Sequence, residues 1–375
     1  MTKILFTGGG TAGHIFPIMA VAREIRKLGI EAEFFFLGPK DEFSSILLSQ
    51  EGIKVKTIIA GKLRRYWQLK SALQNIIDLV FKIPLGFFFS FFYLFFLTPD
   101  LIFSKGGYGS LPVVFWGWIF RVPILLHESD VAPGLVNRMM SKLTPHIFVS
   151  FPIAKTEYFS EKKMIFFGNP IRKEILTGSK AKAQELFGLS GEKPVILVMG
   201  GSQGAQSIND LILAILPEML DSFELIHQTG EKHFTQVAAE AKVMISQELE
   251  KYYHPIPFLK EIELKEAYAS ADIIISRAGS GSIFEIAALA KPSILIPLLF
   301  SAQDHQVKNA YAYADSGGAL VIEEANLTPH FLLEKLRYLI SHYDELERMS
   351  QKAKEFSQPD SAHNIAQYII DSLAK

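Results

Sequence analysis

The stretch that decides the fold is residues 271–310, ADIIISRAGSGSIFEIAALAKPSILIPLLFSAQDHQVKNA. Its isoleucine run at 273–275 ends in small residues, and apolar residues then recur with helical spacing, so the pattern predicts a strand, a loop and a helix. A second strand, expected over 293–298, ends in polar residues at 303–306. Because open parallel sheets bind ligands at the edge where the strands end, we expect a ligand site there.

The loop of small residues at 277–282 suits an anion such as a diphosphate. Backbone N–H groups approach a phosphate closely only where side chains are small, and the N-terminus of the following helix favours negative charge. Glu285 follows about one turn into that helix, where its carboxylate can accept hydrogen bonds from the vicinal hydroxyls of a sugar. Taken alone, the same residues also fit a tight βα turn with Glu285 as a solvated helix residue.

With 375 residues, 49% of them hydrophobic, the chain is long enough for two domains. It has no cysteine, which excludes disulfides and thiolate metal sites and fits a reducing environment. Residues 1–150 are net basic and the rest net acidic, so we expect only the first half to meet an anionic surface. Nucleic acid is not expected as a partner, because the sequence has no stripe of Lys and Arg. The apolar residues before the first glycines are too few for a signal peptide, which predicts a cytoplasmic chain.

The chain opens with the pattern of a strand at 3–7, a glycine loop at 8–13, a helix, and a strand at 33–37. This pattern resembles a dinucleotide-binding fingerprint, but its glycines run GGGTAG rather than G-x-G-x-x-G. Gly38 and Pro39 also stand where a ribose-binding acid is expected. NAD binding, and with it an oxidoreductase, is therefore disfavoured.

Glycine or polar residues repeatedly follow the predicted strands, and the opening pattern of the chain restarts at 195–205. We therefore predict an α/β fold with two doubly wound parallel-sheet domains. The expected boundaries are 1–165 for the N-terminal domain, 175–355 for the C-terminal domain and 356–375 for a final helix that packs back on the N-terminal domain.

The segment 76–97 is almost entirely apolar and rich in phenylalanine, and a basic, aromatic cluster at 62–70 precedes it. Asp78, Lys82 and Pro84 interrupt its first half, so we expect the uninterrupted run to be too short to span a membrane. We interpret it as a helix packed partly in the core and partly on an anionic membrane surface; the alternative is an ordinary buried helix. The residues expected to contact the membrane are Arg64, Arg65, Trp67, Phe88, Phe91 and Phe92.

Seven motifs, in order and at compatible spacing over nearly the whole chain, resemble those of the MurG family of glycosyltransferases. They are GGGTAGHIFP at 8–17, KGGYGSLP at 105–112, LHES at 126–129, GNPIR at 168–172, GGSQGAQSIN at 200–209, SRAGSGSIFE at 276–285 and QDHQVKNA at 303–310. The resemblance implies a GT-B fold, in which two Rossmann-like domains face each other across a cleft. It implies that the second domain binds the donor nucleotide, and that the first binds the lipid acceptor and the membrane.

The resemblance further implies an enzyme that transfers N-acetylglucosamine, with inversion, from UDP-N-acetylglucosamine (UDP-GlcNAc) to the C4 hydroxyl of the muramoyl sugar of lipid I, forming lipid II. The family uses no metal in the active site and no cofactor, and it acts as a peripheral protein on the cytoplasmic face of the plasma (inner) membrane. Cell-wall synthesis proteins are implied as further partners. Two alternatives stay open: a transferase of the same fold with a different lipid-linked acceptor, and a nucleotide-sugar binding protein without turnover.

The resemblance also assigns roles to residues of this sequence. His14 is the first candidate for the general base and Glu128 the second, although His14 also fits a helix cap or a phosphate ligand. The acceptor diphosphate is expected at Gly106, Gly107 and Tyr108. The residues expected to bind the donor are Thr11, Ala12, Gly13, Asp130, Arg172, Gly201, Ser202, Ile262, Gly279, Ser280, Gly281, Ser282, Ile283, Glu285, Gln303 and Gln306. Arg172 and helix dipoles are expected to neutralise the leaving diphosphate, and Glu285 to bind the ribose.

Three residues depart from the family's pattern. Asp130 stands where the family often has Asn, Ala12 where it usually has Gly, and Leu111 where small residues are common. A carboxylate at position 130 would repel a phosphate group unless it contacts sugar hydroxyls instead. The contact between residue 130 and the donor sugar is therefore expected to differ from that in the family.

Overall fold

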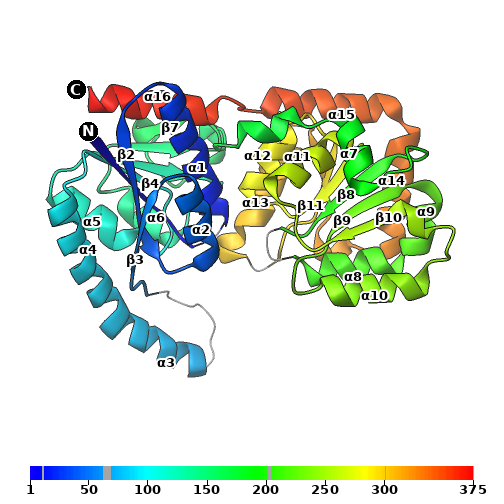
Figure 1. The fold of residues 1–375 in the computed structure, drawn as a ribbon, viewed down its shortest axis with the longest axis horizontal. Coiled ribbons are helices and arrows are strands. Elements are labelled where there is room, and N and C mark those ends of the chain that lie inside the picture. The colour runs from blue at the N-terminus through cyan, green and yellow to red at the C-terminus, as the bar shows by residue number, and fades with distance from the viewer. Residues whose placement is uncertain (11, 62–68, 202–203, 300, 375) are drawn as a thin grey trace. The chain divides into compact units, whose positions relative to one another are not determined.

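The computed structural model describes the chain except residues 11, 62–68, 202–203, 300 and 375. It divides into two compact units (Figure 1). The first unit is Met1–Ile171 with Asp360–Lys375, and the second is Arg172–Pro359.

The first unit is built on a parallel sheet with the strand order β3-β2-β1-β4-β5-β6-β7. Its strands are β1 (Thr2–Thr7), β2 (Ala32–Pro39), β3 (Lys54–Ile58), β4 (Leu101–Ser104), β5 (Ile124–Glu128), β6 (His146–Val149) and β7 (Met164–Phe166). The chain runs outward from β1 to β3 and then returns to β4 on the other side of β1. The topological switch point of this sheet, where ligands bind in open α/β folds, therefore lies between β1 and β4.

Helices cover both faces of this sheet. They are α1 (Ala12–Lys27), α2 (Glu42–Gln50), α3 (Leu69–Ile77), α4 (Ile83–Leu97), α5 (Leu111–Ile119), α6 (Leu135–Met140) and α16 (Ser361–Leu373), with 3-10 turns at Ile153–Lys155 and Glu161–Lys163. The last of these, α16, packs against α1, and its Ile365 and Ile369 are buried in one cluster with Ile15 and Ile18. The C-terminal residues are thus part of the core of the first unit.

The second unit repeats the design, with the parallel strand order β10-β9-β8-β11-β12-β13. Its strands are β8 (Val195–Met199), β9 (Glu224–Gln228), β10 (Tyr253–Ile256), β11 (Ile273–Ser276), β12 (Ser293–Leu295) and β13 (Ala319–Val321). Its helices are α7 (Lys180–Phe187), α8 (Gln206–Ala214), α9 (Leu216–Ser222), α10 (Phe234–Met244), α11 (Glu261–Ser270), α12 (Ser280–Ala288), α13 (His305–Ala314), α14 (Pro329–Ser341) and α15 (Tyr343–Phe356), with 3-10 turns at Lys173–Thr177, Glu250–Tyr252, Ala302–Asp304 and Glu324–Asn326. By the same reasoning its switch point lies between β8 and β11.

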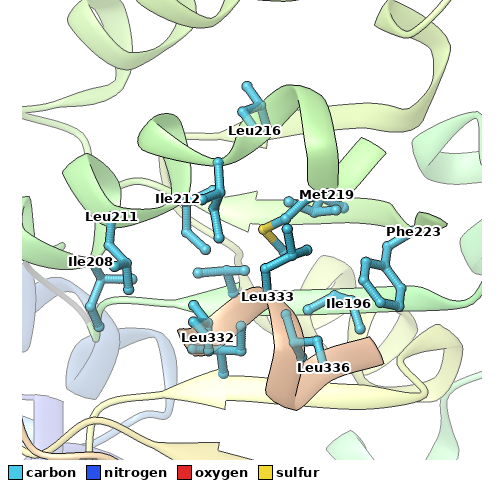
Figure 2. Packing of buried hydrophobic residues seen from close by; sticks show 14 of the residues in the cluster. Ile196, Ile208, Leu211, Ile212, Leu216, Met219, Phe223, Leu332, Leu333 and Leu336 are labelled. Atoms are coloured by element: carbon cyan, nitrogen blue, oxygen red, sulfur yellow. The ribbon is translucent and has the colours of Figure 1, made fainter. Parts of the chain in front are cut away.

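The core of the second unit lies between its sheet and helices α8, α9 and α14. Figure 2 shows Leu336 of α14 close to Ile196 of β8, while Ile212 and Met219 approach from α8 and α9. All of these side chains are buried. This packing holds β8, one of the two strands beside the switch point, against α14.

Two strand predictions need correction. Strand β3 was not expected, because Lys54, Lys56 and Thr57 give it a polar, largely exposed pattern typical of an edge strand. The apolar run at 255–258 predicts a strand there, but the observed strand β10 begins two residues earlier and covers Tyr253–Ile256. Proline lacks a backbone N–H, which the edge position of β10 tolerates.

The apolar segment forms a long helix in which α3 continues through a π-helical turn, Asp78–Lys82, into α4. Lys82 Nζ lies 2.6 Å from Asp78 Oδ1, so the two charges that interrupt the sequence pair one turn apart. Among the described residues, Leu73–Leu97 is long and apolar enough, by length and composition, to cross a membrane. Asp78, Lys82 and Pro84 therefore do not end the helix, and its length by itself does not exclude a membrane crossing.

Helix α4 nevertheless packs on the first unit along one face. Gly86, Ser90 and Leu94, spaced four residues apart, are its buried residues, and α4 contacts α5 and β3. The opposite face exposes large apolar side chains, including Phe88 (56%), Phe92 (41%) and Phe96 (76%). Phe91 is half-buried, with its ring 4.9 Å from that of Trp116 on α5.

Candidate functional site

At the switch point of the first unit, the loops after β1 and β4 meet around His14. The imidazole lies in the first turn of α1, beside Gly9 and Gly107. A Cβ added to Gly9 would lie 3.0 Å from the ring, and one added to Gly107 would lie 3.3 Å from Nε2. Gly107 also has a φ of +87°, which favours glycine. Both glycines are therefore needed for the imidazole to occupy this position.

His14 is half-buried in this position. Burial, aided by the ammonium of Lys105 and opposed by the carboxylate of Asp130, lowers the pKa of His14 to about 4. The imidazole is therefore neutral at physiological pH, and it can donate or accept a hydrogen bond.

Glu128 ends β5 and is 4% exposed. Its two carboxylate oxygens accept hydrogen bonds from the backbone N of Asp130, at 3.0 Å, and from Asn137 Nδ2, at 2.7 Å. Burial, followed by the charge of Asp130, raises the pKa of Glu128 toward neutrality, although these hydrogen bonds and the charge of Lys105 act against the shift. A carboxylate with a raised pKa is suited to general-base chemistry near neutral pH.

Lys105, which the sequence reasoning did not select, lies at the centre of this site. Its ammonium is 2.6 Å from His127 Nδ1 and donates to Ser129 Oγ, while His127 Nε2 is 3.2 Å from the carbonyl oxygen of Gly168. An ammonium can only donate, so His127 accepts through Nδ1 and carries its proton on Nε2. Lys105 is 2% exposed, and this burial lowers its pKa although Glu128 and Asp130 act to raise it.

The loop predicted for the acceptor is held by a turn and by α6. Ser110 donates from both its backbone N and its Oγ to the carbonyl oxygen of Gly107. Gly106 has a φ of +78°, and a Cβ there would overlap the side-chain amide of Asn137. Tyr108, the third predicted residue, is half-buried in this turn. Asn137 therefore contacts both the glycine loop and Glu128, a link that no local sequence signal indicated.

In the second unit, a buried ion pair links Arg172 to Glu285 near the switch point. Arg172 Nη2 donates to Glu285 Oε1 at 2.9 Å, Tyr268 Oη donates to Glu285 Oε2 at 3.1 Å, and Arg172 Nη1 is 3.4 Å from Glu261 Oε2. Burial lowers the pKa of Arg172, but the attraction and hydrogen bond of Glu285 outweigh it, so the pKa is raised. Burial, then Glu285, raises the pKa of Tyr268 as well. Both carboxylate oxygens of Glu285 are thus oriented by the protein.

The first turn of α12 has the geometry of an anion site. Gly279 is its N-cap, and Ser280, Gly281 and Ser282 form its first turn, whose backbone N–H groups lack partners within the helix. A Cβ added to Gly279 or Gly281 would meet no protein atom within 4 Å, so space for a ligand lies beside both. Ile283, by contrast, is buried in the core.

Described residues after β8 and after β12 also belong to this edge of the sheet. Gly201 has a φ of +85°, and its carbonyl oxygen accepts from Gln228 Nε2 at 3.0 Å. Gln303 adopts the left-handed region, at φ +62°. Gln306 is held by its Oε1, which accepts from the backbone N of Leu298 at 3.0 Å. Ile262, at the start of α11, is 72% exposed.

The predicted residues are thus gathered in two groups, one in each unit. His14, Glu128, Asp130, Gly106, Gly107 and Tyr108 belong to the first unit, as does Gly13, which is exposed. Thr11, Ser202, Arg64, Arg65 and Trp67 lie outside the described residues, as does the side chain of Ala12. Sequence reasoning missed Lys105, Asn137 and Tyr268. Only Lys105 had a signal, because it directly follows a predicted strand and precedes a glycine pair.

Both halves of the chain match domains of one glycosyltransferase family. Residues 4–149 match the glycosyltransferase family 28 N-terminal domain, and residues 195–365 match the glycosyltransferase family 28 C-terminal domain.

Curated relatives match over the full length. The chain is 35% identical, over all of both chains, to the UDP-N-acetylglucosamine–N-acetylmuramyl-(pentapeptide) pyrophosphoryl-undecaprenol N-acetylglucosamine transferase 2 of Bacillus cereus. It is also 35% identical to the transferase of the same name, without a number, from Clostridium tetani, covering 98% of this chain and 97% of that protein.

Solved structures share the fold. The crystal structure of Acinetobacter baumannii MurG matches 99% of this chain and 100% of its own, with a TM-score of 0.74 at 23% identity. The UDP-GlcNAc 2-epimerase of Neisseria meningitidis, solved with UDP-GlcNAc bound, matches all of both chains with a TM-score of 0.66 at 16% identity. The predicted GT-B fold is confirmed.

Proposed function

The chain belongs to glycosyltransferase family 28, and on that premise we propose that it transfers N-acetylglucosamine from UDP-GlcNAc to the C4 hydroxyl of the muramoyl sugar of lipid I. One observation carries this proposal. Each unit gathers polar residues of the family's motifs at the switch point of its own sheet, one group suited to acid–base chemistry and the other to a nucleotide.

The donor, we infer, binds to the second unit. The first turn of α12 supplies backbone N–H groups and a helix dipole for the diphosphate, and Glu285 accepts hydrogen bonds from the ribose hydroxyls. Arg172 was expected to contact the diphosphate directly. Because its guanidinium is already engaged by Glu285 and Glu261, we propose instead that it orients the Glu285 carboxylate.

The acceptor, in this proposal, binds to the first unit at the loop of Gly106, Gly107 and Tyr108. The C4 oxygen attacks C1 of N-acetylglucosamine, the bond from C1 to the diphosphate oxygen breaks with inversion, and UDP leaves with the electron pair. Glu128 takes the hydroxyl proton, because its raised pKa suits a base near neutral pH, whereas the low pKa of His14 makes the imidazole a poor proton acceptor. We therefore rank Glu128 ahead of His14, which acts as a neutral hydrogen-bonding group.

The test is release of UDP from UDP-GlcNAc, measured with and without a short-chain lipid I analogue. We expect turnover only with the analogue, and a disaccharide-linked lipid as the product. UDP could instead be released with a different lipid-linked sugar and not with the lipid I analogue. That result would contradict lipid I as the acceptor and would still support the donor site. Binding of UDP-GlcNAc without turnover on either acceptor would overturn the assignment as a transferase.

We further propose that the chain acts as a peripheral protein at the cytoplasmic face of the membrane, through the exposed face of α3 and α4. The support is the row of exposed phenylalanines on α4. In addition, only 17% of the most apolar stretch within Leu73–Leu97 is buried. Because Gly86, Ser90 and Leu94 hold α4 on the first unit, we favour a helix lying on the surface over one crossing the bilayer. Contacts with other cell-wall synthesis proteins stay a prediction.

A further inference from the structure

Arg277 opens the loop of small residues at 277–282, and the proposed function gives it no role. It directly follows β11, and its backbone N donates to the carbonyl oxygen of Met199 at the end of β8. Its side chain is 9% exposed, so the guanidinium is largely removed from water. A charged group in such a position needs a counter-charge and hydrogen-bond acceptors.

The guanidinium contacts three residues of other segments. Nη1 donates to the carbonyl oxygen of Ile296 at 3.1 Å, while Nη2 donates to Ser207 Oγ at 2.8 Å and to Glu324 Oε1 at 2.6 Å. Ser207 Oγ also donates to Glu324 Oε1, at 2.6 Å. Burial acts to raise the pKa of Glu324, but the hydrogen bonds from Ser207 and Arg277 outweigh it, so the pKa is lowered. The Glu324 carboxylate is therefore the charged partner of Arg277 at neutral pH.

These three residues lie in the segments that follow β8, β12 and β13. Ser207 belongs to the first turn of α8, Ile296 directly follows β12, and Glu324 begins the 3-10 turn after β13. Because β8, β11, β12 and β13 are neighbours in one parallel sheet, their carboxyl ends meet at the same edge. One guanidinium thus joins the ends of four adjacent strands.

We propose that Arg277, paired with Glu324, is a positioning residue that holds the phosphate- and sugar-binding part of the donor site in place. The pairing is a property of the folded chain by itself. The ligand that it serves rests on the proposed function.

The contacts of Arg277 lead to two parts of the proposed donor site. Helix α12 begins three residues after Arg277, so the position of Arg277 sets where the chain enters the first turn of that helix. On the other side, the backbone N of Leu298, two residues after Ile296, donates to Gln306 Oε1 at 3.0 Å. The first turn of α12 is proposed to bind the diphosphate, and Gln306 is expected to bind the donor, so both depend on segments that Arg277 joins.

The nucleoside should depend on Arg277 much less. Glu285, proposed to bind the ribose, is oriented by its own hydrogen bonds with Arg172 and Tyr268. Loss of Arg277 should therefore weaken binding of the part of the donor beyond the nucleoside. A general loss of stability would not make this distinction.

The experiment compares R277M, E324Q and R277M/E324Q with the wild type in the full chain. Affinities are measured for uridine by ligand-observed NMR, and for UDP and UDP-GlcNAc by calorimetry. We expect R277M to bind UDP and UDP-GlcNAc about tenfold more weakly or worse, the value of one hydrogen bond to a charged group, and uridine within about twofold of the wild type. E324Q keeps an acceptor oxygen and should show a smaller loss. The double variant should bind no more weakly than R277M, because both substitutions break the same pair.

The matched control is H254A. His254 Nε2 lies 2.9 Å from Oε1 of Glu224, which begins β9 at the amino ends of the strands of the same sheet. This variant should lower the unfolding temperature without changing the ratio of UDP affinity to uridine affinity. An equal change of that ratio in H254A and R277M would show that Arg277 acts only through stability, and would overturn the inference.

Amide hydrogen exchange of the ligand-free protein tests the pairing without a substrate. R277M should exchange faster than the wild type at 296–298 and 206–210, the segments that the guanidinium contacts, and H254A should not. Exchange that is unchanged in R277M at both segments would contradict the positioning role.

The outcomes separate this inference from the proposed function. The expected losses of UDP and UDP-GlcNAc affinity, with no transfer by the wild type on any acceptor, would support the inference and remove the function. Transfer by the wild type, with unchanged UDP and UDP-GlcNAc affinities in R277M and E324Q, would overturn the inference and keep the function. If R277M does not fold, E324Q decides, because an unchanged UDP affinity in that variant contradicts the positioning role.

Discussion

Burial moves the pKa values of the two candidate bases in opposite directions. The neutral form of each group is favoured, so the pKa of His14 falls to about 4 while that of Glu128 rises. A base must lose its proton before it can accept another, so transfer by Glu128 should increase as the pH rises through its raised pKa. The sequence could name both residues, but it could not rank them, because ranking depends on neighbours from other elements.

Replacing Glu128 by Gln should lower kcat by about 10²–10⁴-fold, the usual contribution of a general base. In the wild type, the raised pKa of Glu128 predicts that kcat falls as the pH is lowered, and E128Q should lose this acidic limb of the pH profile. H14Q is the matched control, with a smaller loss and the limb retained. Rates measured from pH 5 to 9 with both substrates test this. A limb that disappears in H14Q and persists in E128Q would reverse the ranking.

The Arg172–Glu285 pair predicts a strong effect on stability. R172M leaves a carboxylate that is only 11% exposed without its cation, which should cost about 3–5 kcal/mol. E285Q removes the charge but keeps the shape, so R172M/E285Q should recover most of the loss. Denaturant unfolding of the four proteins measures this, and calorimetry with UDP should show weakened binding in every variant. If the losses of unfolding free energy in R172M and E285Q simply add in the double variant, the pairing is contradicted.

At the scale of elements, α4 has two faces of different character. The stripe of Gly86, Ser90 and Leu94 is buried because glycine and serine let the helix approach β3 and α5 closely. The other face leaves Phe88, Phe92 and Phe96 in solvent. Contiguous exposed aromatic side chains on a described helix usually indicate a partner surface.

Replacing Phe88, Phe92 and Phe96 by Ser should release the protein from anionic phosphatidylglycerol vesicles. Each phenylalanine contributes about 1.5–3 kcal/mol when buried, so the loss should exceed a hundredfold in affinity. Phe91 is left unchanged because it packs on Trp116.

The matched control replaces Phe43 and Ile46 on α2, which are also exposed in the first unit, by Ser. Vesicle sedimentation and UDP affinity are measured together. Binding that survives in the α4 variant, or that is lost equally in the α2 control, would remove the membrane role from α4.

At the scale of the whole molecule, the chain leaves the first unit, forms the second, and returns. Residues 360–375 belong to the first unit, where Ile365, Ala366 and Ile369 join its core. The sequence pattern predicted such a return, but it could not name the partner of the last helix, because α1 is more than 300 residues away in sequence.

Truncation after Pro359 should therefore destabilise the first unit and spare the second. I369A is the milder variant, and a fully buried isoleucine cut to alanine typically costs about 2–5 kcal/mol. Thermal unfolding with and without UDP distinguishes the units, because UDP should stabilise only the transition of the second. A lowered unfolding temperature of the second unit, with that of the first unit unchanged, would contradict this arrangement.

The sequence by itself determined the class of fold and the positions of the glycine loops that follow the strands beside the switch points. Strand-then-glycine patterns are local, and each depends only on apolar runs and on residues that permit tight turns, so β1, β8 and β11 could be recognised directly. The edge strand β3 escaped because its residues are too polar to follow that pattern.

Only the tertiary structure decided what surrounds each functional side chain. Lys105 meets His127, Asn137 meets Glu128, and Tyr268 meets Glu285 across sequence separations of 22, 9 and 17 residues. Burial and charge act through space rather than along the chain, so the pKa of His14 or Glu128 depends on which elements the fold brings beside it.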